Sequence, residues 1–169
     1  MGASGDDSGM ALNFQRLSIF CHNIAQSLHV YCEVLGLHVC MDKTITGPAA
    51  GRLLGLPSCS IRIVLLAPAA GEKPVLGLFD VTDTELETRA TGPRKLVRKQ
   101  TALVLGTDDF EAAVARIREA GLELLCEPED YVSPGAAPGA PSMHYREVIF
   151  FDPDDILVSI MQVTPVPGP

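Results

Sequence analysis

The sequence predicts an α+β fold made of two tandem modules that share the order βαβββ. First, the strand-and-helix stretch at residues 14–36 recurs at residues 101–121, and such self-similarity indicates a duplicated unit. Second, each copy is followed by three further short apolar runs separated by turn residues. Third, a chain of 169 residues with 47% hydrophobic residues can bury one ordinary core, so both modules should form one compact domain.

The first copy shows why these residues predict a strand and then a helix. Apolar Leu17 and Ile19 alternate with Arg16 and Ser18, which is the period of a half-buried strand. Asn23 can cap a helix, and Gly36 permits the left-handed turn that ends one. The expected apolar stripe of this helix is Ile24, Leu28, Tyr31 and Leu35.

The second copy repeats this order, with Asp108 or Asp109 as the cap and Gly121 as the stop. Aligned on their caps, the two helices differ by one residue before the terminal glycine. The remaining expected strands are 37–42, 60–67 and 75–82 in the first module, and 122–127, 145–151 and 156–162 in the second.

Turn residues and composition divide the chain into segments. Residues 43–57 and 129–142 are expected to be loops, with one helical turn at 52–56. The expected organisation is a disordered tail (1–12), a first module (13–82), a surface linker (83–99), a second module (100–163) and a tail that frays (164–169).

Bulk properties exclude several classes of partner. The net charge of −8 opposes binding to nucleic acid, whose phosphates would be repelled. No apolar run reaches the length of a membrane span. The five cysteines have no CxxC spacing and are expected to be reduced, which predicts a cytoplasmic protein.

Three segments resemble the vicinal oxygen chelate superfamily, the group of glyoxalases, bleomycin-resistance proteins and extradiol dioxygenases. They are SLHVYCEVLGL after the first strand, DDFEAAVARIREAG in the second module and FFDPDDILVSI at the end. The resemblance implies paired βαβββ modules that form a curved mixed sheet around a cup-shaped pocket. It also implies a small-molecule ligand and a homodimer.

Members of this superfamily that use a metal place its ligands at four corners of the cup. Carried over one by one, these corners fall on Arg16, Asp80, Ala102 and Ser159. Arginine is a permanent cation without a lone pair to give, and alanine offers no donor. We therefore expect no metal and no cofactor, and we hypothesise that an Arg16–Asp80 ion pair occupies the metal position, either as a structural element or aimed at a substrate.

Alternation along the strands predicts which side chains line the cup. The predicted lining is Ser18, Phe20, Leu78, Ala102, Val104, Leu157, Ser159 and Met161. Such a lining suits a small, mostly hydrophobic ligand fixed by a few polar contacts, and the alternative is that these side chains fill a core.

The segment Met143–Glu147 combines several ionisable side chains. His144 could act as a general acid or base, Tyr145 could donate to an oxyanion, and Glu147 could hold or abstract a proton. Alternation turns His144 and Arg146 to one side and Tyr145 and Glu147 to the other, so the cluster cannot act at one point. A solvated strand edge is the alternative interpretation.

Three functions remain open from the sequence. The first is a metal-independent lyase, isomerase or epimerase acting on a small apolar or aromatic carbonyl compound, with Arg16 as electrophile and a carboxylate or His144 as base. The second is a binder of small molecules or antibiotics without chemistry, and the third is a metal-dependent glyoxalase or dioxygenase whose ligands are misassigned. The basic residues of the linker, Arg94, Lys95, Arg98 and Lys99, are interpreted as a solvated surface.

Overall fold

A computed structural model describes residues 13–87, 94–135, 137 and 139–166. The expected tail at 1–12 and part of the expected linker (88–93) lie outside these residues, as does 167–169. The first module consists of β1 (Leu17–Phe20), α1 (Ile24–Leu28), η1 (His29–Val34), β2 (His38–Gly47), α2 (Pro48–Leu53), β3 (Cys59–Ala67) and β4 (Leu76–Val81). The second consists of β5 (Ala102–Gly106), α3 (Phe110–Glu119), β6 (Leu124–Ser133), β7 (Met143–Phe151) and β8 (Leu157–Pro165).

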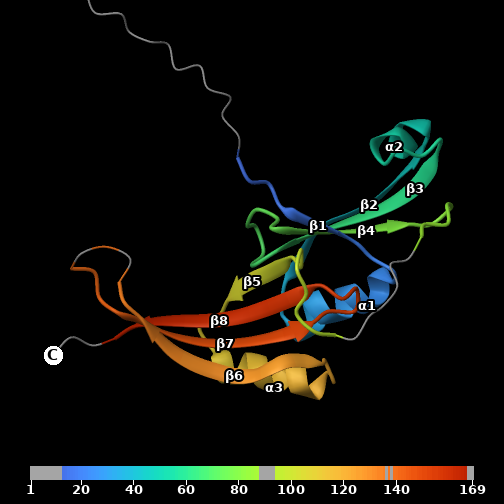
Figure 1. Cartoon of the computed structure of the whole chain (residues 1–169). Helices are drawn as coiled ribbons and strands as arrows, with labels where there is room; N and C mark the ends of the chain where they lie inside the picture. Colours follow the sequence, from blue (N-terminus) through green and yellow to red (C-terminus); the bar gives the residue numbers. More distant parts are fainter. Residues whose placement is uncertain (1–12, 88–93, 136, 138, 167–169) are drawn as a thin grey trace, which may run out of the picture.

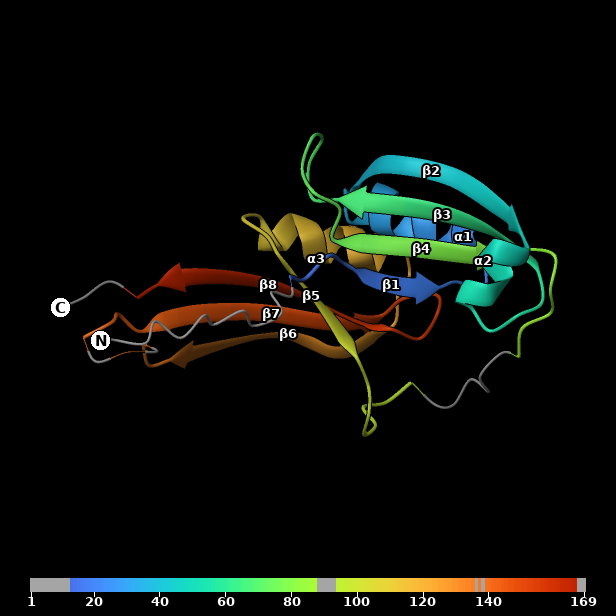
Figure 2. The same ribbon diagram turned by 90° about the horizontal axis from the view of Figure 1, so that it is seen from above.

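The strands form two four-stranded mixed sheets of identical topology (Figures 1 and 2). Sheet A has the order β1-β4-β3-β2, and sheet B has the equivalent order β5-β8-β7-β6. The pairs β1–β4 and β5–β8 are parallel, and the other pairs are antiparallel. This confirms the predicted tandem βαβββ modules, although the two sheets are separate rather than one closed sheet. Their edge strands β1 and β5 lie near each other in both views.

Side chains cap both principal helices, as their sequences predict. The Asn23 side chain accepts a hydrogen bond from the Ala25 amide (3.1 Å), and Asp109 accepts one from the Ala112 amide (3.1 Å). Gly36 (φ +82°) and Gly121 (φ +68°) end the helices in the left-handed region, where glycine is strain-free.

The extra residue of the first helix is accommodated by a π-helical segment, η1. Its defining bond runs from the Leu35 amide to the Val30 carbonyl (2.9 Å), five residues back instead of four. The wider turn changes which residues face the core. Val30, Tyr31 and Val34 are buried, whereas Leu28 and Leu35 of the expected stripe are only half-buried.

Several elements are longer than the sequence predicts. Strands β2 and β6 continue into the expected loops at 43–57 and 129–142, and the expected helical turn at 52–56 forms earlier, as α2. Strand β8 continues to Pro165, so residues 164–165 of the expected frayed tail belong to a ladder with β7. Cross-strand hydrogen bonding extends these segments where hydrophobic alternation does not reveal them, because β2 and β6 are edge strands with exposed side chains.

One hydrophobic cluster joins the two modules. It contains Ile19, Val30 and Leu78 from the first module and Phe110 and Phe150 from the second. Helix α3 contacts η1, and the Arg116 guanidinium donates to the Glu33 carbonyl (2.5 Å). Neither module therefore has a core of its own that is complete without the other.

A buried hydrogen bond crosses the same junction. The Tyr31 hydroxyl donates to a carboxylate oxygen of Asp152 (2.7 Å), and both residues are fully buried. The other oxygen of Asp152 accepts the amides of Asp154 and Ile156 (2.9 and 2.8 Å), which shapes the turn between β7 and β8. Burial raises the pKa of both Tyr31 and Asp152, because the interior disfavours their charged forms.

The five cysteines are free thiols; Cys59 is buried and Cys40 is exposed. No helix in the described ranges has the length and hydrophobicity needed to cross a bilayer.

Replacing Tyr31 with phenylalanine should destabilise the protein by roughly 1–3 kcal/mol, because a buried carboxylate oxygen loses its hydrogen-bond donor. Urea unfolding followed by circular dichroism measures this change. Tyr145→Phe is the matched control, since the Tyr145 hydroxyl makes no hydrogen bond within the described part of the chain. Equal stability of the two variants would contradict the assigned role of Tyr31.

Candidate functional site

Each sheet has a helix face, which packs against the shared core, and a second face that we call the open face. In sheet A, α2 covers part of the open face, where Ala50 packs with Cys59 and Ile61. In sheet A, Ile19 stands beside Leu78 on the helix face, and both are in the core. Ser18 stands beside Gly77, and Phe20 beside Phe79, on the open face. Leu78 therefore packs in the core and does not line the open face, contrary to expectation.

Arg16 lies on the open face of sheet A. Its guanidinium is 5.8 Å from the centre of the Phe79 ring, within the range of a cation–π contact. A Cβ atom at Gly77 would come within 3.2 Å of the Arg16 Nε. Because Gly77 has no side chain, the Arg16 side chain can lie across β4 at this position. Arg16 is exposed and well placed to meet a ligand on this face.

The prediction of an Arg16–Asp80 ion pair is wrong. Asp80 follows Phe79 on β4 and therefore faces the opposite side of the sheet, where it stands in register with Arg62. No salt bridge joins Arg16 to Asp80 among the described residues. The sequence could not reveal this because Leu76–Phe79 has no polar side chain to mark either face.

In sheet B, the open face carries most of the residues expected there. Ala102, Val104 and Gly106 of β5 stand in register with Leu157, Ser159 and Met161 of β8, while Leu103, Leu105, Val158 and Ile160 face the core. Val104 is 56% exposed, whereas Leu157 and Ser159 are buried. The β5–β8 part of the open face is thus apolar apart from the buried Ser159 hydroxyl.

The Ser159 hydroxyl holds a carboxylate from the neighbouring strand. It donates to one oxygen of Glu147 (2.5 Å), and the Tyr131 hydroxyl donates to the other (3.1 Å). Tyr131 also stacks on Tyr145, with ring centres 5.0 Å apart and planes inclined by 5°. Desolvation and the hydrogen bond to Glu147 raise the pKa of Tyr131, which keeps it a donor at neutral pH. A carboxylate held in this way can accept a proton or a hydrogen bond from a ligand.

His144 and Arg146 lie on the other face of β7, as alternation requires. His144 is 3.0 Å from an Asp130 oxygen, and Arg146 bonds Glu111 (2.6 Å) and covers the ring of Phe110 (4.6 Å). The five expected catalytic residues thus occupy four separate places. Arg16 is on the open face of sheet A and Asp80 on its helix side, whereas His144 is on the helix side of sheet B and Tyr145 and Glu147 are on its open face.

The four positions to which the superfamily resemblance assigned metal ligands, Arg16, Asp80, Ala102 and Ser159, do not provide the donors that a metal ion needs. Their side chains are a guanidinium, a carboxylate that faces away, a methyl group and a hydroxyl committed to Glu147. Among the described residues, no group of three or more His, Cys, Asp or Glu side chains is arranged to hold a metal ion.

A cleft of about 1080 Å³, the junction cleft, runs along the edge strand β1. One side is formed by residues 17–22 with Phe79, and the other by residues 94–101 and the β7–β8 turn. The rings of Phe20 and Phe79 are 5.3 Å apart and tilted by 30°; we call them the phenylalanine floor. Phe20 is 50% exposed, although it belongs to a strand.

Two further residues define what the junction cleft can do. Arg94 is anchored by Asp155 (2.9 Å) and Glu123 (3.5 Å) and covers the ring of Phe151 (5.8 Å). Burial raises the pKa of the Cys21 thiol to about 12, so Cys21 is protonated at neutral pH and is a poor nucleophile. The cleft is therefore suited to binding rather than to thiol chemistry.

Sequence reasoning missed the contribution of residues 94–99 to the cleft, because it assigned them to a solvated surface linker. The concentration of cations in this segment could have indicated that it forms one wall of a binding cleft.

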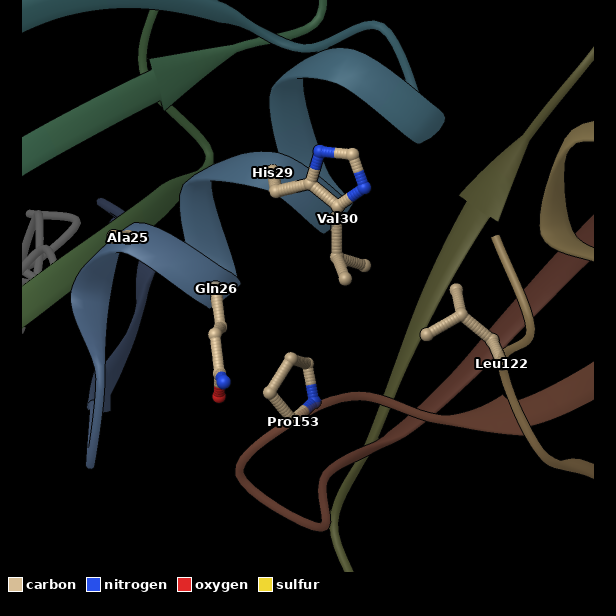
Figure 3. A pocket seen from close by; sticks show the side chains of 6 residues that line it. All are labelled: Ala25, Gln26, His29, Val30, Leu122 and Pro153. Atoms are coloured by element: carbon tan, nitrogen blue, oxygen red, sulfur yellow. The ribbon is translucent and has the colours of Figure 1, made fainter. Parts of the chain in front are cut away.

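A smaller depression of about 390 Å³ lies between α1 and the β7–β8 turn (Figure 3). Its lining is mostly apolar, with side chains from Ala25, Gln26, His29, Val30, Leu122 and Pro153.

Comparison with known proteins agrees with the geometry. The model of the Glyoxalase/Bleomycin resistance protein/Dioxygenase superfamily matches residues 13–160. A search of the curated proteins found no significant match.

Three solved structures illustrate the likeness of fold. A glyoxalase family protein from Bacillus cereus has a TM-score of 0.68 and 20% identity, covering 92% of this chain and 97% of its own. The trypanothione-dependent glyoxalase I of Leishmania major has a TM-score of 0.56 and 14% identity, covering 90% and 87%. A glyoxalase/dioxygenase from Nostoc punctiforme has a TM-score of 0.56 and 18% identity, covering 97% of both chains.

Proposed function

The chain belongs to the Glyoxalase/Bleomycin resistance protein/Dioxygenase superfamily, and we propose that it binds a small, flat, largely apolar organic molecule in the junction cleft without using a metal. The observation that carries this proposal is the phenylalanine floor. A half-exposed Phe20 beside Phe79 leaves aromatic surface in water, and a flat ligand would remove it. The cleft volume is sufficient for a ligand of ordinary size.

Binding without chemistry is favoured over catalysis by the separation of the ionisable side chains. General acid–base catalysis requires groups within hydrogen-bond reach of the same reacting atoms. The expected electrophile Arg16 lies on sheet A, whereas Glu147 lies on sheet B and His144 faces away from both open faces. The acids at the β7–β8 end of the cleft are also committed, since Asp154 accepts the His22 amide and the Ser27 hydroxyl.

A second candidate function, a metal-independent lyase or isomerase, is favoured by Glu147. Its carboxylate is oriented by Ser159 and Tyr131 on a face that also carries the apolar side chain of Val104. An oriented carboxylate in apolar surroundings can abstract a proton next to a carbonyl group. In this case the substrate would lie on sheet B rather than in the junction cleft.

We further propose that the protein is a homodimer. Strands β1 and β5 are edge strands with no partner on their outer sides among the described residues, and each carries an exposed apolar side chain on its open face, Phe20 and Val104. Unpaired edges with exposed apolar residues favour association. A second copy laid against these edges would close the open side of the junction cleft.

The binding proposal predicts that N-phenylnaphthylamine, a neutral aromatic dye that fluoresces in apolar surroundings, binds the protein and that Phe20→Ala weakens binding. Loss of one stacking partner should raise the dissociation constant roughly three- to tenfold, as aromatic pairs contribute about 0.5–1.5 kcal/mol. Phe14→Ala is the control, because Phe14 is 82% exposed and does not line the cleft. Binding should survive dialysis against EDTA; loss on dialysis would contradict metal independence.

The second candidate function predicts that the protein accelerates exchange of the α-protons of phenylacetone for deuterium, followed by proton NMR in D2O. Glu147→Gln should slow this exchange about 100-fold, the usual contribution of a general base. Glu129→Gln is the matched control, since Glu129 stands beside Glu147 on the same face of sheet B. Equal rates in the three proteins, or none above background, would exclude this function for phenylacetone.

The dimer proposal predicts a sedimentation-equilibrium mass of twice 18.0 kDa. Val104→Asp should dissociate the dimer, because a charge would be buried without a partner in the interface. Val39→Asp is the control, since Val39 is similarly exposed (52%) but lies on β2 at the far edge of sheet A. A monomeric wild-type protein would disprove the proposal.

A further inference from the structure

The wall of the junction cleft opposite β1 is the most basic segment of an acidic protein. Four of the thirteen lysine and arginine residues of the chain fall at positions 94, 95, 98 and 99, whereas the net charge is −8. All four line the junction cleft, which also contains the phenylalanine floor. The cations are therefore concentrated beside exposed aromatic surface rather than spread over the protein.

Two of the four acids that line the cleft are already committed to other partners. Asp155 bonds Arg94 (2.9 Å), and Asp154 accepts the Ser27 hydroxyl (2.8 Å). Arg94 is likewise committed, since it bonds Asp155 and Glu123 and covers Phe151. Two lining acids, Glu87 and Asp80, form no salt bridge and no side-chain hydrogen bond in the described part of the chain, and the Asp80 side chain belongs to the opposite face of sheet A.

Three cations of the cleft have no such commitment. Lys95, Arg98 and Lys99, which we call the rim cations, form no salt bridge and no side-chain hydrogen bond within the described ranges. They outnumber the two uncommitted acids, Glu87 and Asp80, by three to two, and residues 94–101 contain no acid. The local potential of this wall is therefore positive and favours an anion.

The backbone fixes the position of one rim cation. Lys99 has φ +71°, a conformation that a residue with a side chain adopts at a cost. It is held there by the turn in which the Gln100 amide donates to the Val97 carbonyl (3.3 Å) and by the Gln100 side chain, which donates to the Asp155 carbonyl (3.2 Å). The hydrogen bonds from Gln100 and Arg94 to Asp155 thus hold both ends of the segment 95–99, which keeps this segment along the cleft.

From the aromatic floor on one side and the uncommitted cations on the other, we propose that the ligand class of the junction cleft is a small aromatic anion, such as an aryl carboxylate or sulfonate. Its ring lies on Phe20 and Phe79, and its anionic group faces Arg98 and Lys99. This inference rests on the proposed binding function and adds the charge of the ligand. Arg98 and Lys99 act as specificity residues, because they distinguish an anion from a neutral compound of the same shape.

The test compares two dyes that differ by one sulfonate group. Anilinonaphthalene sulfonate is an anion, and N-phenylnaphthylamine is its neutral analogue. In the double variant Arg98→Gln/Lys99→Gln, the dissociation constant of the sulfonate should rise roughly three- to tenfold, since each exposed charge pair contributes modestly. The neutral dye should bind as it does to the wild type, and added salt should weaken only the sulfonate.

The control variant Lys43→Gln/Arg52→Gln removes the same charge from exposed positions on β2 and α2, which do not line the cleft. It should leave both dyes unchanged, and far-UV circular dichroism confirms that each variant is folded. Equal weakening of the sulfonate by both double variants would overturn the inference, because the effect would then come from net charge. The inference also fails if neither variant weakens the sulfonate while Phe20→Ala weakens both dyes, an outcome that leaves the binding function intact. If Phe20→Ala has no effect on the neutral dye, the binding function itself fails.

Discussion

The arrangement of the two modules depends on the buried hydrogen bond between Tyr31 and Asp152. Tyr31 comes from the helix of the first module, and Asp152 forms the turn between the last two strands of the second. Since both groups are removed from water, separating the modules would expose the cluster around them and leave the carboxylate of Asp152 without its donor. The bond therefore fixes how the β7–β8 turn meets α1 and η1, and this turn forms one end of the junction cleft.

The π-helical segment connects this bond to the duplicated sequence. The first helix has one residue more than the second, and η1 accommodates it without moving either the Asn23 cap or the Gly36 stop. The wider turn brings Tyr31 fully into the core, where its hydroxyl reaches Asp152. The corresponding residue of α3, Ile117, is also buried but has no polar group. A small asymmetry between two similar modules thus provides the polar contact that joins them.

Strand alternation separates the chemistry of the molecule into distinct places. Glu147 and Ser159 meet on one face of sheet B, while His144 and Arg146, three residues and one residue before Glu147, are held on the other face by Asp130 and Glu111. In sheet A the same rule puts Arg16 over Phe79 and turns Asp80 away. The result is a molecule with one aromatic cleft bordered by cations and one oriented carboxylate on another sheet. They correspond to the two functions that we propose, binding in the junction cleft and proton transfer on sheet B.

The sequence by itself determined the duplicated βαβββ order, the helix cap at Asn23 and the stops at Gly36 and Gly121, because these depend on local hydrogen bonds and backbone preferences. It limited the second cap to Asp108 or Asp109, and the structure shows Asp109. It also separated His144 from Glu147, since alternation needs only the chain order. Only the tertiary structure decided which face Leu78 and Asp80 occupy, because a strand with apolar residues on both sides contains no local polarity signal. The same holds for the bond from Ser159 to Glu147 and for the approach of residues 94–101 to β1, which bring together groups distant in sequence. Such contacts depend on how the two modules pack, and packing is a property of the whole core rather than of any one segment.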